Sequence, residues 1–346
     1  MNIALLGSRT LCASAAIALL AGCGSAQVPI PRTGISASQD IERDAATGSW
    51  MLPEAKSENL LYVTNYSYIS VYSYPQDKLV GILNGFRSSV GECVDKKGDI
   101  VITNSAKSGK IPEYAHGGTK PIAELTTEHV GPVGCAFDAI TGDLAVTGFG
   151  EPPTVDIFKS AQGKPILYKD KNVVETQFCG YDSNGNLFVG GIRNFSSGAP
   201  ELDELPKGGN KFVEIRLNAA IDGGAGIQWD GKYLAIGAYV PKGSGYTPVI
   251  YRFSISRSQG TLVSTTTLGS PAYITALQFF ILNGTLMVPN WYFVDSSEKK
   301  NVLFYKYPRG CLLYTSGEDE AVTCDCNSST AASSRRTRAR SSTTSS

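Results

Sequence analysis

The sequence predicts an all-β fold, a six-bladed β-propeller of four-stranded antiparallel blades with an incomplete last blade. The first observation is a turn motif of Asp followed by Gly, which recurs ahead of an apolar run. Its aspartates lie 43, 44 and 48 residues apart, at Asp95, Asp138, Asp182 and Asp230. Such a period is typical of blades repeated around an axis. The second observation is composition, because 42% hydrophobic residues, 37 Gly and 17 Pro suit many short strands and turns.

Each copy of the repeat reads as a meander of strands. In the first copy, residues 60–65, 69–74 and 79–83 alternate β-branched or aromatic residues with polar ones, between turn formers. The fourth copy is interrupted by a loop rich in Gly and Pro at 194–210. The other strands are expected at 100–103, 111–114, 121–125, 144–147, 155–158, 165–168, 187–189, 212–217, 234–236, 249–255, 262–267, 286–288 and 302–305.

An innermost strand precedes five of the copies. Its glycines and small residues suit strands crowded around an axis, where bulky side chains would collide. The Asp-Gly motif is then the hairpin between first and second strands, in which Asp caps the turn and Gly adopts positive φ. The motif aspartates are therefore predicted to be structural. The inner strands are expected at 91–94, 134–137, 178–181, 226–229 and 275–280.

A short motif at the end of the second strand adds a resemblance. Residues 62–65 read Tyr-Val-Thr-Asn and are echoed by Val-Ile-Thr-Asn at 101–104. This resembles the signature of YVTN and NHL-type β-propeller repeat proteins, over roughly residues 60–310. The resemblance implies six blades and is specific for fold. It does not imply one function, since such propellers include binding proteins and a minority of enzymes.

The two ends of the propeller do not match. Blade one begins at its second strand, so its innermost strand should come from the C-terminus, but the pattern stops after Gly310. We interpret 59–310 as the propeller and 311–346 as a disordered tail that is not native to the fold, because its Ser, Thr and Arg cannot bury a core. An alternative is that 48–52 supplies the missing strand.

The N-terminus reads as a bacterial lipoprotein signal peptide over residues 1–22. Its apolar run is far shorter than a membrane-spanning helix and ends in Leu-Ala-Gly before Cys23. This tetrapeptide resembles the lipobox, which implies a lipid on the Cys23 thiol. In lipoproteins, a residue such as Gly24 rather than Asp after the cysteine favours location in the outer membrane. Residues 23–58 are expected to be a tether that holds the domain off the bilayer.

Three cysteines lie in successive inner strands, Cys93, Cys135 and Cys179. Cys135 and Cys179 stand three residues before their turn aspartates, whereas Cys93 stands two before and so faces the other way. We expect all three to be small buried hydrophobes. The alternative is a Cys135–Cys179 disulfide, which requires Cα atoms within ~7 Å in an oxidising compartment.

The candidate ligand-binding residues close the second strands. A ring of Asn65, Asn104 and Asn290, with Glu92 on an inner strand, could coordinate Ca²⁺ or a polar ligand. Trp291 belongs to a set of loop aromatics that could bind a carbohydrate or peptide, together with Tyr66, Tyr68, Phe149, Tyr239 and Tyr292. Related six-bladed lactonases hold one divalent metal, but no full metal set can be assembled here, and no catalytic residue is assigned.

These features predict a lipid-anchored protein of the bacterial envelope that acts as a binding or scaffolding module without catalysis. The alternative is a metal-dependent lactonase- or lyase-like hydrolase with an axial site. A third interpretation is a structural partner in an envelope complex. The expected partners are the membrane, through the lipid, and a protein or carbohydrate. No cofactor is assigned. Balanced charge, with 31 Lys+Arg and 31 Asp+Glu, argues against nucleic acid.

Overall fold

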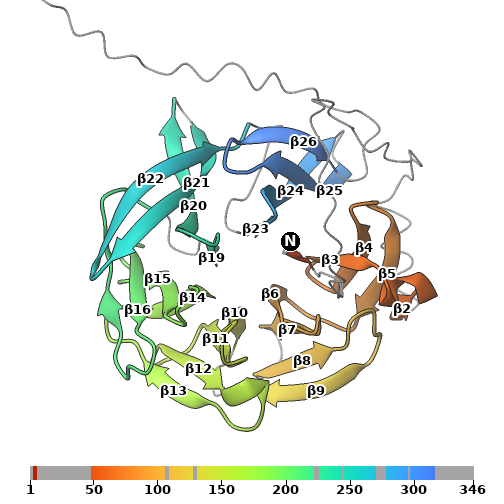
Figure 1. The fold of residues 1–346 in the computed structure, drawn as a ribbon, viewed down its shortest axis with the longest axis horizontal. Coiled ribbons are helices and arrows are strands. Elements are labelled where there is room, and N and C mark those ends of the chain that lie inside the picture. The colour runs from red at the N-terminus through yellow and green to blue at the C-terminus, as the bar shows by residue number, and fades with distance from the viewer. Residues whose placement is uncertain are drawn as a thin grey trace, which may run out of the picture.

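The computed structural model describes residues 3–5, 48–105, 109–127, 131–221, 226–243, 245–269, 278–294 and 297–315, with 3–5, 291–294 and 297–300 described by their backbone only. These residues form six sheets arranged in a ring around a central axis (Figure 1). The predicted six-bladed, all-β propeller is confirmed. No helix among the described residues is long and apolar enough to cross a membrane.

Blades one to three follow the chain in order. In blade one, β3 (Asn59–Thr64), β4 (Tyr68–Tyr74) and β5 (Leu79–Asn84) are flanked by β1 (Ile3–Leu5) inside and β2 (Trp50–Met51) outside. Blade two has β6 (Ser89–Val94), β7 (Ile100–Asn104), β8 (Lys110–Tyr114) and β9 (Pro121–Thr126). Blade three has β10 (Pro132–Phe137), β11 (Leu144–Gly148), β12 (Thr154–Phe158) and β13 (Ile166–Lys169). The short 3₁₀ helices are η1 (Pro53–Lys56) and η2 (Lys159–Ala161).

Blades four to six complete the ring. Blade four has β14 (Glu175–Tyr181), β15 (Leu187–Ile192), β16 (Pro200–Leu205) and β17 (Val213–Glu214). Blade five has β19 (Ile227–Trp229), β20 (Leu234–Lys242), β21 (Gly245–Ser256) and β22 (Gln259–Thr267), with β18 (Arg216–Leu217) parallel to β22. Blade six has β23 (Phe280–Leu282), β24 (Thr285–Val294), β25 (Ser297–Lys306) and β26 (Cys311–Thr315).

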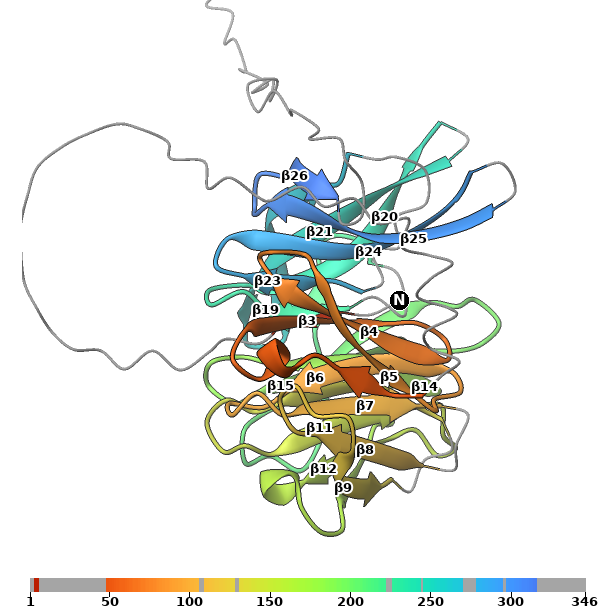
Figure 2. The ribbon, with the colours of Figure 1, turned by 90° about the vertical axis from the view of Figure 1, so that its right-hand side faces the viewer.

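The hydrophobic core lies between the blades. Successive sheets stack face to face, as the side view of blades one to three shows (Figure 2). One face of blade two thus meets the opposite face of blade three, where Val101 and Val146 share a buried cluster. The ring closes in the same way, because Val63 of blade one packs with Met287 and Phe304 of blade six. The inter-blade contacts are therefore apolar at the closing joint as well.

The threonine of the Val-Ile-Thr-Asn motif joins two blades. Thr103 Oγ1 accepts the backbone N–H of Gly91 at 2.7 Å and lies 2.7 Å from the carbonyl oxygen of Val133, to which it can donate. Gly91 is on the inner strand of the same blade and Val133 on that of the next. Thr147 occupies the equivalent place in blade three, with its hydroxyl on the carbonyl of Gln177. The motif therefore encodes an inter-blade contact.

The two ends of the propeller differ from the sequence prediction. The last blade is not incomplete, because Cys311–Thr315 forms its fourth strand, so folded structure extends five residues past the predicted boundary. The reason is packing on both sides of the strand, since Leu312 is buried and the Tyr314 ring stacks on Phe304 at 4.2 Å. Residues 316–346 lie outside the described residues.

Blade one also closes differently. Its innermost strand is β1, which pairs antiparallel with β3, Ile3 opposite Val63 and Leu5 opposite Leu61. These residues fall within the predicted signal peptide. The alternative that 48–52 supplies the inner strand is wrong, because Trp50 pairs with Ile82 on the outer strand β5.

Three further strand predictions differ from the structure. Residues 200–205, predicted as part of a loop, form the third strand of blade four, and the predicted strand at 212–217 divides between the edges of blades four and five. The strand at 200–205 was not predicted because it carries acidic residues, yet the Glu201 and Asp203 side chains are buried in the structure. The inner strand of blade six, predicted at 275–280, is Phe280–Leu282 in the described part of the chain, and residues 275–277 lie outside it.

Candidate axial binding site

The inner strands leave a cavity of about 370 Å³ at the axis. Glycines let the strands converge, because an added Cβ at Gly134 would lie 2.6 Å from the carbonyl oxygen of Gln177 in the next blade. The lining combines aromatic residues, among them Phe137, Phe178 and Trp229, with glycines and polar residues such as Glu92 and Gln278. A cavity of this size and lining is typical of a small-molecule site.

Glu92 brings a carboxylate to this cavity. Both carboxylate oxygens are shielded from solvent, and among the described residues neither accepts a hydrogen bond of good geometry, although the Thr64 backbone lies near. Burial raises the pKa of Glu92 well above its usual value, opposed by the positive charge of the chain's α-amino group and by the backbone of Thr64. Since a buried polar group is normally hydrogen-bonded, this carboxyl is available to a ligand. That Glu92 binds one remains a prediction.

Two unsatisfied donors line the same cavity. The indole Nε1–H of Trp229 and the amide Nε2–H₂ of Gln278 are buried and find no acceptor among the described residues. The neighbouring Gln228 is satisfied, because its side chain bonds both the N–H and the carbonyl oxygen of Ile281 at 2.7 and 2.8 Å. The contrast shows that unpaired donors are not a general property of this wall. Sequence analysis missed Trp229, although an aromatic directly before the Asp230 turn could have marked it.

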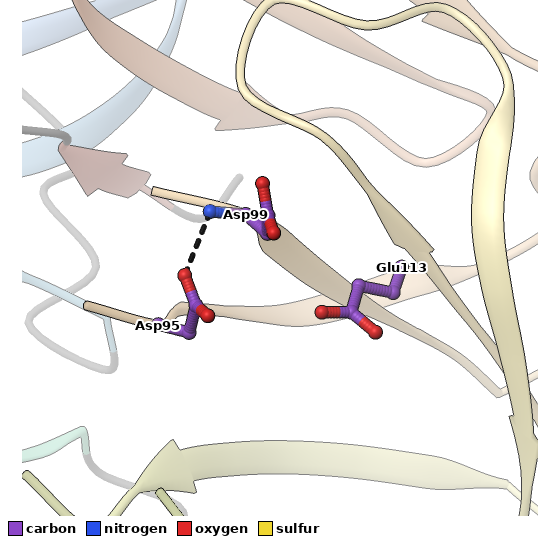
Figure 3. Close-up of side chains that lie close together, drawn as sticks. All are labelled: Asp95, Asp99 and Glu113. Carbon is purple, nitrogen blue, oxygen red and sulfur yellow. Dashed lines mark hydrogen bonds between the residues drawn. The ribbon is translucent and has the colours of Figure 1, made fainter. Parts of the chain in front are cut away.

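A cluster of three carboxylates adjoins the cavity. Asp95, Asp99 and Glu113 each offer an oxygen, and these oxygens lie within 4.8 Å of one another (Figure 3). Asp95 also lines the cavity. Its Oδ1 accepts the backbone N–H groups of the turn, as predicted for the Asp-Gly motif, including that of Asp99 at 2.9 Å. Burial, followed by the charges of Asp99 and Asp95, raises the pKa of Glu113.

The three predicted asparagines do not line the cavity. Asn65 Nδ2 donates to the Val63 carbonyl oxygen and to Ser70 Oγ, both at 3.3 Å. Asn104 Oδ1 accepts the backbone N–H of Arg87 at 3.1 Å. All three are buried, and the side-chain amide of each hydrogen-bonds to a neighbouring strand or loop. Glu92 is therefore not brought together with them as one metal-binding set at the cavity.

Asn290 differs from the other two. Its Nδ2 donates to Asn301 Oδ1 at 2.9 Å, across the β24–β25 pair, while its own Oδ1 is buried and has no partner in the described part of the chain. Trp291 lies beside it on β24 opposite Lys300, but its side chain is outside the described part of the chain. Cys23 is also outside it. Ligand binding by the asparagines and Trp291, and lipid attachment at Cys23, remain predictions.

The cysteines pair differently from the prediction. Cys93 and Cys135 form a disulfide with Cα atoms 5.8 Å apart, and Cys179 is free and buried. The expectation of three free cysteines is therefore wrong, as is the alternative Cys135–Cys179 bridge. The disulfide links the inner strands of blades two and three and forms part of the cavity wall.

A second group of buried carboxylates lies between blades three and four. Asp170 and Asp203 are fully buried. Asn172 joins them, with its backbone N–H on Asp170 Oδ1 at 2.9 Å and its Nδ2 on Asp203 Oδ1 at 2.6 Å. The Oδ2 atom of each is buried and meets no donor from the described residues. Burial and the Asp170 charge raise the pKa of Asp203 to about 7. The sequence signal for this group is the carboxylate that recurs mid-strand at Glu113, Asp156 and Asp203.

Comparison with known proteins supports the architecture. Neither a family model nor a curated protein matches this chain. A chain of the nidogen/laminin complex matches with a TM-score of 0.55 at 12% identity, covering 74% of this chain and 92% of that one. Kuenenia stuttgartiensis hydrazine synthase matches at 0.49 and 13%, covering 74% and 75%. The Myceliophteria thermophila Cps50 (Swd1) β-propeller domain matches at 0.49 and 10%, covering 80% and 88%. The nidogen/laminin match shows the fold alone.

Proposed function

We propose that this protein is a lipid-anchored, envelope-exposed propeller that binds a small polar ligand in its axial cavity without catalysing a reaction. The observation that carries the binding function is the 370 Å³ cavity into which Glu92, Trp229 and Gln278 bring unsatisfied polar groups. A buried group without a partner costs about 1–3 kcal/mol, which a complementary ligand would recover. The nidogen/laminin complex is an example of this fold in a protein assembly, so a protein partner on the outer surface is compatible with the proposal.

The test of binding uses tryptophan fluorescence and thermal unfolding. Pools of small cations, anions, zwitterions and sugars are titrated into the protein. A ligand in the cavity should change the emission of Trp229 and raise the unfolding midpoint with concentration. Trp229→Phe should abolish the emission change, whereas Trp50→Phe, at the outer edge of blade one, should preserve it. Absence of any hit, or hits that persist in Trp229→Phe with full emission change, would exclude the axial site.

The anchor proposal is supported by the lipobox-like residues ahead of Cys23 and by the Cys93–Cys135 disulfide, which suits an oxidising compartment. Processing before Cys23 would remove β1 from blade one. Expression in a bacterium with metabolic labelling by an alkyne fatty acid tests it. Cys23→Ala should lose the label and Cys12→Ala should keep it. An unlabelled wild-type chain that retains residues 1–22 by mass would contradict the anchor.

A second candidate function is the metal-dependent hydrolase, which the Asp95, Asp99 and Glu113 cluster beside the cavity favours. Three carboxylate oxygens suit a hard divalent cation such as Ca²⁺. If this reading holds, Ca²⁺, Mg²⁺ or Mn²⁺ should raise the unfolding midpoint of the wild type, and Glu113→Gln should remove the shift. If none of the three metals changes the unfolding midpoint, the hydrolase proposal is rejected and the binding function remains.

A further inference from the structure

The axial cavity is asymmetric in its polar groups. In a ring of six blades, blade two stands opposite blade five, so Glu92 on β6 and Trp229 on β19 face the axis from opposite sides. Gln278 precedes β23 of blade six, which lies next to blade five and its inner strand β19 in the ring (Figure 1). One side of the cavity thus offers a carboxylate and the other offers two N–H donors.

From this arrangement, and resting on the proposed binding function, we infer that the axial ligand is a small organic ammonium compound with a hydrogen-bond acceptor at its other end. The ammonium group would bind the Glu92 carboxylate, and the acceptor would take the Trp229 and Gln278 donors. The aromatic residues among the lining suit the same charge, because organic cations bind favourably beside aromatic rings.

Other ligand classes fit less well. An anion would approach the buried Glu92 carboxyl without a cation to balance it, since no described salt bridge includes that residue. A wholly apolar ligand would leave the carboxyl and both donors unsatisfied, each at a desolvation cost. A cationic end and an acceptor end satisfy all three groups at once.

The test compares isosteres on the processed protein, purified from membranes in detergent. 4-(Aminomethyl)pyridine, 4-pyridinemethanol and isonicotinate, which share the ring nitrogen as acceptor, are titrated by calorimetry in two buffers of different ionisation enthalpy. The amine should bind at least about tenfold more tightly than the alcohol. Its binding should also release protons to the buffer, because Glu92 loses its proton to form the ion pair. Isonicotinate should not bind.

Variants identify the residue. Glu92→Gln keeps the shape but should remove both the amine preference and the proton release, while Glu124→Gln, at an exposed carboxylate of β9, should leave both unchanged. Unfolding midpoints check that both variants fold. Equal affinity of the amine and the alcohol, or no amine binding, would overturn the inference. If a non-cationic ligand then changes Trp229 emission, the binding function survives and only the ammonium inference is lost. If nothing does, both are lost.

Discussion

Cys93 of blade two and Cys135 of blade three are joined across the blade interface, although their side chains leave their own sheets on opposite faces. Opposite faces meet because the blades stack in one direction around the ring, so the front of one sheet packs on the back of the next. Cys135 and Cys179 both face the preceding blade, as shown by their separate clusters, and cannot meet.

The disulfide should stabilise the propeller. The bridge joins residues 42 positions apart. In the chain-entropy model, a loop of that length lowers the conformational entropy of the unfolded chain by an amount worth about 4 kcal/mol of stability. Replacing both cysteines, as Cys93→Ser with Cys135→Ser, should therefore lower the free energy of unfolding by about 2–5 kcal/mol in urea titrations. Cys179→Ser is the control for a buried thiol without a bridge. A Cys135–Cys179 peptide in mass-spectrometric mapping would contradict the pairing.

Thr103→Val should weaken the joint between blades two and three. The substitution preserves volume but leaves the Gly91 N–H and the Val133 carbonyl without the hydroxyl. Loss of these buried bonds should cost about 1–3 kcal/mol of unfolding free energy. Thr126→Val, at an exposed position on β9, is the matched control and should change stability little. Equal effects of the two substitutions would show that the hydroxyl has no such role.

Gly134→Ala tests the close approach of the inner strands. The new Cβ would lie 2.6 Å from the Gln177 carbonyl oxygen and 2.9 Å from the Phe178 Cα, both of them backbone atoms that cannot rotate away. We expect a loss of about 1–3 kcal/mol from overpacking, measured by thermal or urea unfolding. Gly269→Ala, where nothing lies within 4 Å, should be neutral or slightly stabilising. A neutral Gly134→Ala would mean that the strands stand further apart.

The pair of Asp170 and Asp203 should make stability depend on pH. The pKa of Asp203 is raised to about 7 in the folded state, above the ordinary value near 4 of the unfolded chain. Its contribution is therefore fully present below pH ~4 and is lost as pH rises through ~7. Wild-type protein should lose unfolding free energy over that range because a second negative charge becomes buried with the first.

Asp203→Asn removes the charge and should reduce this loss by roughly 1–3 kcal/mol. The measurement is urea unfolding at several pH values between 4 and 8. Glu151→Gln, at an exposed carboxylate, should leave the wild-type profile unchanged. If the Asp203→Asn profile fell as steeply as that of the wild type, the pH dependence would originate elsewhere.

Much of the fold followed from local signals. The Asp95 turn is an example, because capping by the Asp carboxylate and positive φ at Gly98 are properties of the hairpin itself. Local signals failed at the strand that contains Glu201 and Asp203, because its buried residues are charged. They also failed at the strand of Leu312 and Tyr314, because that strand is stabilised by contacts with the rest of the fold, such as the stacking of Tyr314 on Phe304. The asparagines were also predicted from a local pattern, the end of the second strand. In the structure their side chains bond to neighbouring strands and loops, whereas the donors that line the cavity, Trp229 and Gln278, were not predicted.

The sequence by itself determined the blade repeat, the class of fold and the position of Glu92 on an inner strand, because turn chemistry and period-two alternation act over a few residues. Tertiary structure decided which cysteines meet, which strands close blades one and six, and which polar groups share the axial cavity. Those outcomes depend on how one sheet faces the next around the ring. That relation joins residues about 40 or more positions apart in the repeat, and no local pattern contains it.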